Sequence, residues 1–403
     1  MAALDTVREA VAKAHGSEWA RVVSTLIRVT GDWSLAEDCA AEAFESALTV
    51  WERNGVPRNP GAWLTTVAKN RALDRLRRAA VLDRKLKEVA AVTELEHLDP
   101  GRPDFPDDRL RLIFTCCHPA LPLESRVALT LRTVAGLTTE QIARAFIVST
   151  STIAQRIVRA KRKITEAGVP YRVPDTEALP ARLGGVLAVL YLAFNEGYTT
   201  RSEVADEALR VTRALARLLP DEPETLGLLA LMLFQHSRRH AREKDGMLLT
   251  LEEQDRALWD VDAINEARLL LARAASLRHP GPYQLQAAIA AVHATAPMAD
   301  ATDWPAIVAL YDRLLTHNAS PVVALNRAIA LGMAAGPDAG LAALDDVAAA
   351  LGDYPLLPAA RADLLRRAGR LEEAAVQYAA AVAVASGDAE RRALQRMLDA
   401  LRG

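Results

Sequence analysis

The sequence predicts an all-α protein. Segments with helical periodicity follow one another along almost the whole chain, and alanine, leucine and arginine, which all favour helices, dominate them. Aromatic residues make up only 5% of the chain, and no run of alternating β-branched residues is long enough for a sheet. We therefore expect helices packed on helices throughout.

Proline- and glycine-rich breaks divide these helices into domains. The breaks DPGRPDFPDD (99–108) and AGVPYRVPD (167–175) are typical of interdomain linkers. We predict a front helical domain, a linker, a second helical domain, a helical middle domain and a repeat domain, which span residues 1–80, 81–106, 107–168, 175–281 and 282–403.

Composition argues against several functional classes. The longest apolar runs, 183–194 and 225–234, are shorter than the roughly 20 residues of a membrane span, and the N-terminus lacks a signal-peptide core. We expect a cytoplasmic protein without a membrane partner. The three cysteines cannot form a disulfide framework, and CCH at 116–118 has no second Cys/His pair at ligand spacing. Packing is favoured there over metal or redox chemistry, so we predict no metal and no cofactor.

Charge is distributed unevenly along the chain. Residues 1–172 hold 26 Lys and Arg against 21 Asp and Glu, whereas residues 173–403 hold 23 against 30. The front is therefore basic and the rear acidic, although the net charge of the chain is only −2. This asymmetry indicates that the front part meets a polyanion.

A short pair of helices in the second domain has the pattern of a helix-turn-helix. The first runs from Thr138, VSTS makes a turn, and the second begins near Thr150 after Ser and Thr residues that suit an N-cap. Its apolar residues fall at i, i+4, i+7 and i+11, which predicts one buried stripe: Ile153, Ile157, Ala160 and Ile164.

The opposite side of this second helix is basic. The stretch STSTIAQRIVRAKRKI (149–164) has five cationic side chains and no acidic one. A solvated surface face is the alternative, but the capped turn and the packing partner favour a helix that enters the DNA major groove. The predicted DNA contacts are Ser149, Thr150, Ser151, Thr152, Gln155, Arg156, Arg159, Arg162 and Lys163.

The front domain pairs an acidic helix with a basic one. In residues 31–54 we expect Ala36, Ala40, Phe44, Ala47 and Leu48 to lie inward and Glu37, Asp38, Glu42 and Glu45 to lie outward. After the loop 54–61, the second helix packs Trp63, Leu64, Val67, Ala68 and Leu73 and exposes Lys69, Arg71, Arg75, Arg77 and Arg78.

These motifs, in this order, resemble the extracytoplasmic-function sigma factors of bacterial RNA polymerase, a group of the sigma-70 family. The resemblance rests on AEDCAAEAFESAL, NPGAWLTTVAKNRALDRLRR and LTTEQIARAFIVSTSTIAQRIVRAKRKI, and it covers residues 1 to about 168. It implies that the front domain corresponds to sigma region 2 and the second domain to sigma region 4.

The resemblance also implies roles for individual residues. Contacts to core polymerase would come from Asp38, Glu42, Phe44 and Glu45, and the loop that begins at Asn54 would hold a flipped base of the −10 element. The path of the separated strand would be lined by Trp63, Lys69, Asn70, Arg71 and Arg75, with Arg78 as a further DNA contact. Loop polar groups with a nearby aromatic suit an unstacked base, and arginines follow phosphates. For Trp63 a core position is an equal alternative.

The tail repeats itself with a period of 34 residues. Small residues match at Ala306, Gly340 and Ala374, and large ones at Leu310, Leu344 and Tyr378. Between the last two copies, Ala328 pairs with Ala362, Leu331 with Leu365 and Val347 with Ala381. This is the tetratricopeptide period, so we expect about three degenerate repeats in a short superhelix.

The middle segment carries a dense mixed-charge cluster: His236, Arg238, Arg239, Arg242, Glu252, Glu253, Asp255, Arg256 and Asp260. An acid–base site is one interpretation, but no nucleophile motif, phosphate-binding loop or metal spacing supports it. A salt-bridged network or a contact surface is favoured, so we predict no catalytic residues and no enzyme. KDGM (244–247) predicts a small hairpin.

The sequence thus predicts a transcription initiation factor whose partners are core RNA polymerase and promoter DNA. Its extension would regulate that activity by packing on the basic front and limiting access, with a protein or small ligand as its partner. The alternative is a helix-turn-helix regulator with a sensing repeat domain that never joins polymerase.

Overall fold

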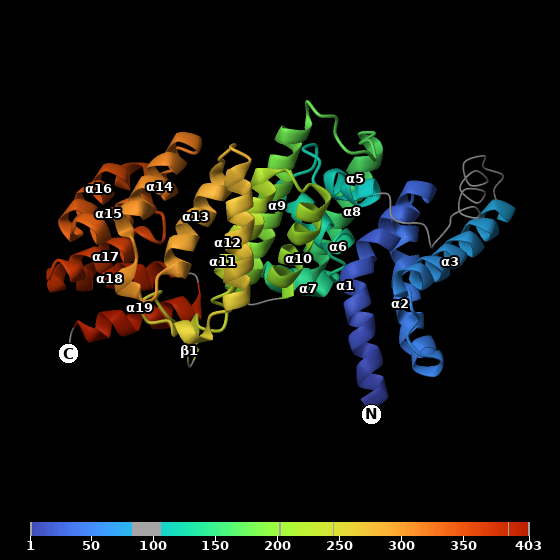
Figure 1. Ribbon diagram of the computed structural model, residues 1–403, viewed down its shortest axis with the longest axis horizontal. Coiled ribbons are helices and arrows are strands. Elements are labelled where there is room, and N and C mark those ends of the chain that lie inside the picture. Colours follow the sequence, from blue (N-terminus) through green and yellow to red (C-terminus); the bar gives the residue numbers. More distant parts are fainter. Residues whose placement is uncertain (1, 83–105, 201–202, 245, 386, 402–403) are drawn as a thin grey trace. The chain divides into compact units, whose positions relative to one another are not determined.

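The protein is helical almost throughout the residues that the computed structural model describes, namely 2–82, 106–200, 203–244, 246–385 and 387–401 (Figure 1). This confirms the all-α prediction. The chain forms two compact units, Met1–Leu218 and Leu219–Gly403. The predicted linker 81–106 falls almost wholly outside the described residues. No described helix is long and apolar enough to cross a membrane.

The first unit begins with three helices: α1 (Ala2–Thr30), α2 (Trp33–Asn54) and α3 (Pro60–Leu82). Asp32 caps α2 by accepting hydrogen bonds from the amides of Ser34 and Leu35, and Gly55, with a φ of 79°, ends it. Two expectations for α2 are wrong. Leu48 is 43% exposed, because α2 turns Ala47 and Trp51 inward instead, and Glu37 is only 4% exposed.

The second domain is built as predicted around a helix-turn-helix. Its helices are α5 (Pro106–Cys116), α6 (Leu123–Thr133), α7 (Thr139–Ala145) and α8 (Thr150–Glu166). Thr138 and Gln141 form a capping box at α7, and the Ser149 side chain accepts a hydrogen bond from the amide of Thr152 at the start of α8. The four apolar residues of α8 form the expected buried stripe.

Two further helices complete the first unit: α9 (Leu179–Thr200) and α10 (Glu203–Leu218). They lie in the segment that the sequence groups into a middle domain, 175–281, but the boundary between the compact units falls at Leu218. The physical reason is that α9 packs on α5, α6 and α7, and α10 packs on α9 and on the same three helices. The first two helices of the extension are thus part of the unit that carries the helix-turn-helix.

The second unit starts with α11 (Pro223–His236), a two-stranded hairpin, α12 (Val261–Ser276) and α13 (Pro282–Thr295). The hairpin pairs β1 (Glu243–Lys244) with β2 (Met247–Leu248) antiparallel, which confirms the predicted turn. Short 3-10 turns at Arg256–Leu258 and Ala299–Ala301 connect the helices.

The mixed-charge cluster binds this hairpin region to the end of the chain. Glu252 pairs with Arg367 at 2.6 Å, Glu253 with Arg396 at 2.7 Å, and Arg239 with Asp260 at 3.4 Å. Arg256 donates to the carbonyls of His293 and Ala296 at the end of α13. These contacts favour the salt-bridged network over the acid–base site.

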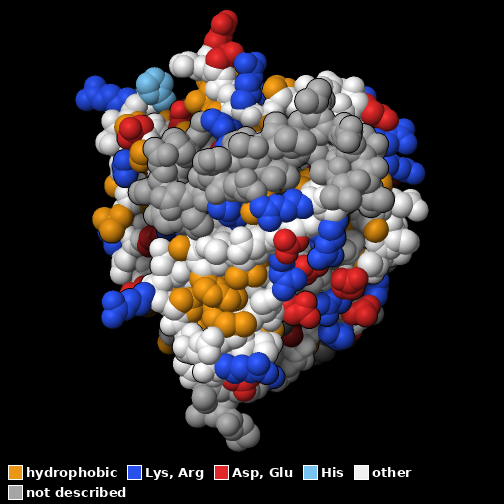
Figure 2. Space-filling model, turned by 90° about the vertical axis from the view of Figure 1, so that its right-hand side faces the viewer, with side chains coloured by type: hydrophobic (Ala, Val, Ile, Leu, Met, Phe, Trp, Pro, Cys, Tyr) orange, Lys and Arg blue, Asp and Glu red, His pale blue; other side chains and the backbone are white. Residues whose placement is uncertain are grey.

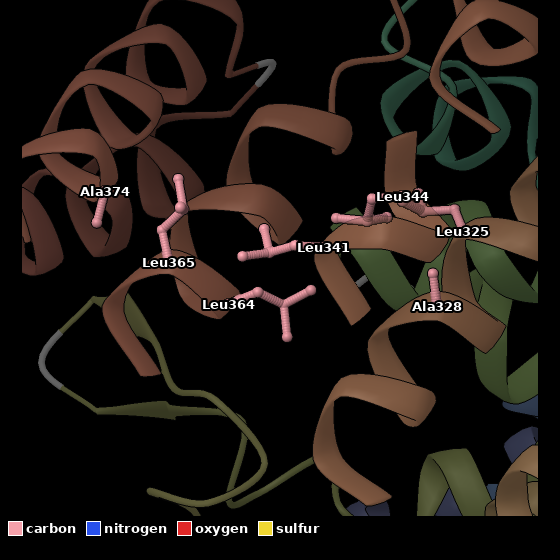
Figure 3. Close-up of a cluster of buried hydrophobic side chains, with 7 residues drawn as sticks. All are labelled: Leu325, Ala328, Leu341, Leu344, Leu364, Leu365 and Ala374. Carbon is pink, nitrogen blue, oxygen red and sulfur yellow. The ribbon is translucent and has the colours of Figure 1, made fainter. Parts of the chain in front are cut away.

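Three helix pairs follow the predicted 34-residue register. They are α14 (Trp304–His317) with α15 (Pro321–Ala335), α16 (Pro337–Leu351) with α17 (Leu357–Arg367), and α18 (Leu371–Val384) with α19 (Asp388–Ala400). Leu344 and Tyr378 are buried at equivalent positions, and so are Ala328 and Ala362. Figure 3 shows one core cluster that joins these helices: Leu325, Ala328, Leu341, Leu344, Leu364, Leu365 and Ala374.

Gly340 explains why small residues recur in this register. A Cβ at this position would come within 2.7 Å of the Gly332 Cα atom and within 3.0 Å of the Ala328 carbonyl oxygen. Helices α15 and α16 therefore touch through their backbones, and a larger side chain would push them apart.

Candidate nucleic-acid interface

Helix α8 presents a polar and basic face to solvent. Ser149, Thr150 and Ser151 are exposed at its N-terminus, while Thr152 is half-buried. Gln155, Arg159, Arg162 and Lys163 are exposed along the helix, and Arg162 pairs with Glu166 at 2.8 Å, one turn further on. An i,i+4 pair of this kind is weak, so it leaves Arg162 available to a phosphate. The geometry suits entry of α8 into a groove.

Arg156 lies apart from this outward face. It lines a cavity of about 260 Å³ between the helix-turn-helix and α9, together with Glu124 and Glu196. The remaining wall is mostly apolar and includes Phe146 of α7 and Leu192 of α9. The sequence places Arg156 among the DNA contacts, and that role stays a prediction; in the structure its side chain lines this cavity together with two acidic residues.

The predicted DNA-binding arginines of α3 are paired with the predicted polymerase-binding acids of α2. Arg71 and Arg75 both bind the Glu42 carboxylate, and Arg75 also lies 3.6 Å from Asp38. Arg71 donates a second hydrogen bond to Ser46 at 2.7 Å. At the end of the unit that carries α2 and α3, acidic and basic side chains are interleaved (Figure 2). Each set therefore partly neutralises the other.

The other predicted residues of the front domain differ in exposure. Glu45, Asn54, Asn70 and Arg78 are exposed, and Lys69 is half-buried. Asn54 ends α2 and so stands at the start of the predicted base-binding loop.

The two aromatic residues on this surface are not equivalent. Phe44 is buried, and its ring packs 5.0 Å from His15 and 5.9 Å from Trp19 of α1. A buried ring cannot touch polymerase in this conformation. Trp63 is half-buried and packs edge-on against Trp51, with 5.5 Å between the ring centroids. This half-buried position is compatible both with a core role for Trp63 and with a role in stacking on a base.

Glu37, which the sequence places on the solvated face of α2, joins the two domains. Its carboxylate accepts a hydrogen bond from the Thr133 hydroxyl at 2.7 Å and pairs with Lys161 of α8 at 3.0 Å. Trp19 of α1 donates to the carbonyl of Thr133 at 3.0 Å. Helix α8, the predicted DNA-binding helix, is therefore bonded to α2. No sequence pattern near Glu37 indicates this contact, because Lys161 lies more than a hundred residues away along the chain.

Arg210 of α10 contacts both domains at once. It donates to the carbonyl of Gly16 in α1 and, at 2.9 Å, to the carbonyl of Ala135 after α6, while Glu207 holds its guanidinium. Burial, and then the nearby charges of Arg210 and Arg132, lower the pKa of His15 to about 4. The neutral His15 ring fits this junction beside Trp19.

The three thiols have the character of packing residues. Burial raises the pKa of Cys39 and of Cys117 to about 11, and it raises the pKa of Cys116 as well. A protonated, buried thiol is a poor nucleophile and a poor metal ligand. Across the described residues, no group of three or more His, Cys, Asp or Glu side chains could hold a metal ion.

Three family models match this chain. Sigma-70 region 2 matches residues 18–81, which lie in α1 to α3, and Sigma-70 region 4 matches residues 111–164, which lie in α5 to α8. A family of unknown function, DUF6596, matches residues 182–275, from α9 to α12.

Two kinds of relatives are similar to the chain. An uncharacterized protein of Rhizobium meliloti (strain 1021) is 40% identical over 395 residues, which cover 94% of this chain and 93% of the relative. The probable ECF RNA polymerase sigma factor SigI of Mycobacterium tuberculosis (strain ATCC 25618 / H37Rv) is 28% identical over 171 residues, which cover 41% of this chain and 58% of SigI. No solved structure matches the chain.

Proposed function

This chain belongs to the extracytoplasmic-function sigma factors of the sigma-70 family, with a C-terminal extension, and on that premise we propose how its DNA-facing helices and its extension work. The protein directs core RNA polymerase to promoter DNA. Sigma factor families are transcription factors and not enzymes. We further propose that it acts in the cytoplasm, where polymerase and chromosome meet.

We propose that α8 reads the −35 element and that α3 follows the melted strand of the −10 element. The observation that carries this division is the presence of two separate basic helices on two domains of one chain, each with arginines at its surface. Arginines on α8 suit phosphates and guanine edges in a major groove. The exposed acids of α2, Asp38 and Glu45, are the proposed contacts to polymerase.

Reconstitution with core polymerase tests this function. The protein should copurify with the core subunits and give defined transcript starts, whereas a regulator that never joins polymerase would do neither. Arg159→Ala should lower initiation at least about fivefold, because α8 loses an outward contact. Arg156→Ala is the comparison on the cavity side of the same helix, and it should lower initiation less than Arg159→Ala does, since Arg156 lines the cavity. Equal loss from both variants would refute the assignment of the outward face.

The two DNA-facing helices lie too close together to reach both promoter elements at once. Lys161 of α8 and the arginines of α3 are both bridged to α2, at Glu37 and Glu42. Glu37 and Glu42 lie about 7.5 Å apart along α2, at 1.5 Å per helical residue, and each bridge to a neighbouring helix adds about 10 Å. The two DNA-facing helices therefore lie within about 30 Å of each other. Elements named −35 and −10 are about 25 base pairs apart, or about 85 Å at 3.4 Å per pair. This short distance supports the proposal that the two domains are held in a closed arrangement here.

We propose that α9 and α10 hold this closed arrangement and thereby limit promoter access. Arg210 supports the proposal because it bonds both to α1, in the front domain, and to the turn after α6, in the second domain. The front domain and the second domain could separate only after Arg210 breaks its hydrogen bonds to the carbonyl oxygens of Gly16 and Ala135. The part of the extension that regulates is then the part within the first unit.

A point variant of the full chain tests this regulation. Arg210→Ala should raise transcription when the concentration of holoenzyme is limiting, because a smaller fraction of the variant protein is in the closed arrangement. Arg217→Ala, at an exposed position on the same helix, is the control and should change nothing. Lower transcription by a folded Arg210→Ala protein would make the extension an activator or a scaffold instead.

A further inference from the structure

The outward face of α8 contains one large apolar side chain, Val158, among its polar ones. Opposite the buried stripe, a second stripe runs at the same i, i+4, i+7 and i+11 spacing: Ser151, Gln155, Val158 and Arg162. Val158 is 64% exposed. At 100° per residue it lies about 50° from the direction opposite the centre of the buried stripe. It would therefore face a groove that α8 enters.

Folding offers no reason for a valine at this position. Val158 buries little surface, and a β-branched residue has a lower helix propensity than alanine or the straight-chain residues. Single exposed apolar residues are ordinary on protein surfaces, so the exposure of Val158 alone does not indicate a binding role. The decisive point is its place along the helix between Gln155 and Arg162, on a stripe whose other members donate or accept hydrogen bonds.

The major groove presents an apolar group only at thymine. Its C5-methyl group accepts apolar contacts, while glutamine suits adenine and arginine suits guanine or phosphate. We propose that Val158 reads a thymine methyl group in the −35 element and so determines specificity at that position. The proposal rests on the proposed function of α8.

The helix geometry also places that thymine. Gln155 precedes Val158 by three residues, or about 4.5 Å along the axis of α8. Because base pairs rise by about 3.4 Å, the thymine lies within about two base pairs of the base that Gln155 contacts. Ala154, which is exposed one turn earlier, lies on the same side of the helix as Val158.

Replacement of thymine by deoxyuridine tests the contact, because it removes only the methyl group. Holoenzyme with the full chain would be titrated on promoter duplexes in which each thymine of the −35 element is replaced in turn. With wild-type protein, one replacement should weaken binding about three- to fivefold, the effect of one buried methyl group. With Val158→Ala, that replacement should have no further effect, while other replacements keep their wild-type response.

A matched valine serves as control. Val376 of α18 is 66% exposed and lies outside the first unit, so Val376→Ala should keep the wild-type deoxyuridine profile. An unchanged profile with Val158→Ala would refute this inference. Uniformly weaker binding to every duplex, with reduced affinity for core polymerase, would identify Val158 as a polymerase contact and refute it too. A wild-type holoenzyme that initiates at no promoter would refute the proposed function, and this inference with it.

Discussion

Glu37→Gln should shift the protein from the closed arrangement toward an open one. The substitution keeps an amide oxygen that can accept from Thr133, but it removes the negative charge that faces Lys161 at 3.0 Å. The Glu37 side chain is only 6% exposed, so its pairing contributes more than a surface ion pair does.

The size of the effect follows from the burial of the pair. A hydrogen bond to a charged group contributes about 1.5–3 kcal/mol, and removal of one partner of a buried pair is usually more costly still. Lys161 keeps 17% exposure and can turn toward water, which limits the loss. We expect about 2 kcal/mol, or roughly a 30-fold change in the ratio of closed to open protein.

Energy transfer between two dyes measures this ratio. Thr66 of α3 and Thr165 of α8 are exposed and can be replaced by cysteine, while the native cysteines are buried and should not react. Glu37→Gln should lower transfer efficiency and raise transcription. Glu52→Gln, an exposed position on α2, is the control. An unchanged transfer efficiency in Glu37→Gln would refute this prediction. Strict additivity of the effects of Glu37→Gln and Lys161→Gln on the ratio of closed to open protein would refute it too, because two paired residues should show a coupling energy in a double-mutant cycle.

Three further predictions concern stability. Ile147 has a φ of 50° and is 84% exposed, so Ile147→Gly should stabilise the first unit by up to about 1 kcal/mol in denaturant unfolding; a loss of stability would show that its side chain matters more than its backbone. Gly340→Val should separate α15 from α16 and lower the melting temperature of the second unit by far more than Ala342→Val does, because Ala342 is exposed on the same helix. The folded pKa of His15 lies at about 4, below its unfolded value of 6.5, so the unfolded state binds more protons between these two pH values. The free energy of unfolding should therefore fall as the pH drops from 6.5 toward 4, by at most about 3 kcal/mol. His15→Gln should remove this pH dependence, and an unaltered pH dependence would assign it to other groups.

Local patterns made much of the molecule predictable. The capped turn before α8, its buried stripe and the 34-residue register of small and large sites all record which side of a helix is buried. The hairpin at 243–248 followed from a two-residue turn signal in the same way. Such signals lie within a few residues of the structure that they determine.

The candidate site was only partly predictable, because its contacts join distant segments. The exposed face of α8 could be inferred from its periodicity, but an exposed valine carries no charge or hydrogen-bonding group that would mark it as a DNA contact in the sequence. Pairing of Arg71 and Arg75 with Glu42 depends on how α3 crosses α2, which periodicity does not specify.

The amino-acid sequence alone determined the helical class, the order of the sigma region 2 and region 4 domains and the repeat period, since each depends on the spacing of residues along the chain. Only the tertiary structure decided that Glu37 is buried, that α9 and α10 join the first unit and that Arg210 bonds to both domains. An amphipathic pattern states that one side of a helix is covered. What covers it is settled by packing between segments far apart in the chain.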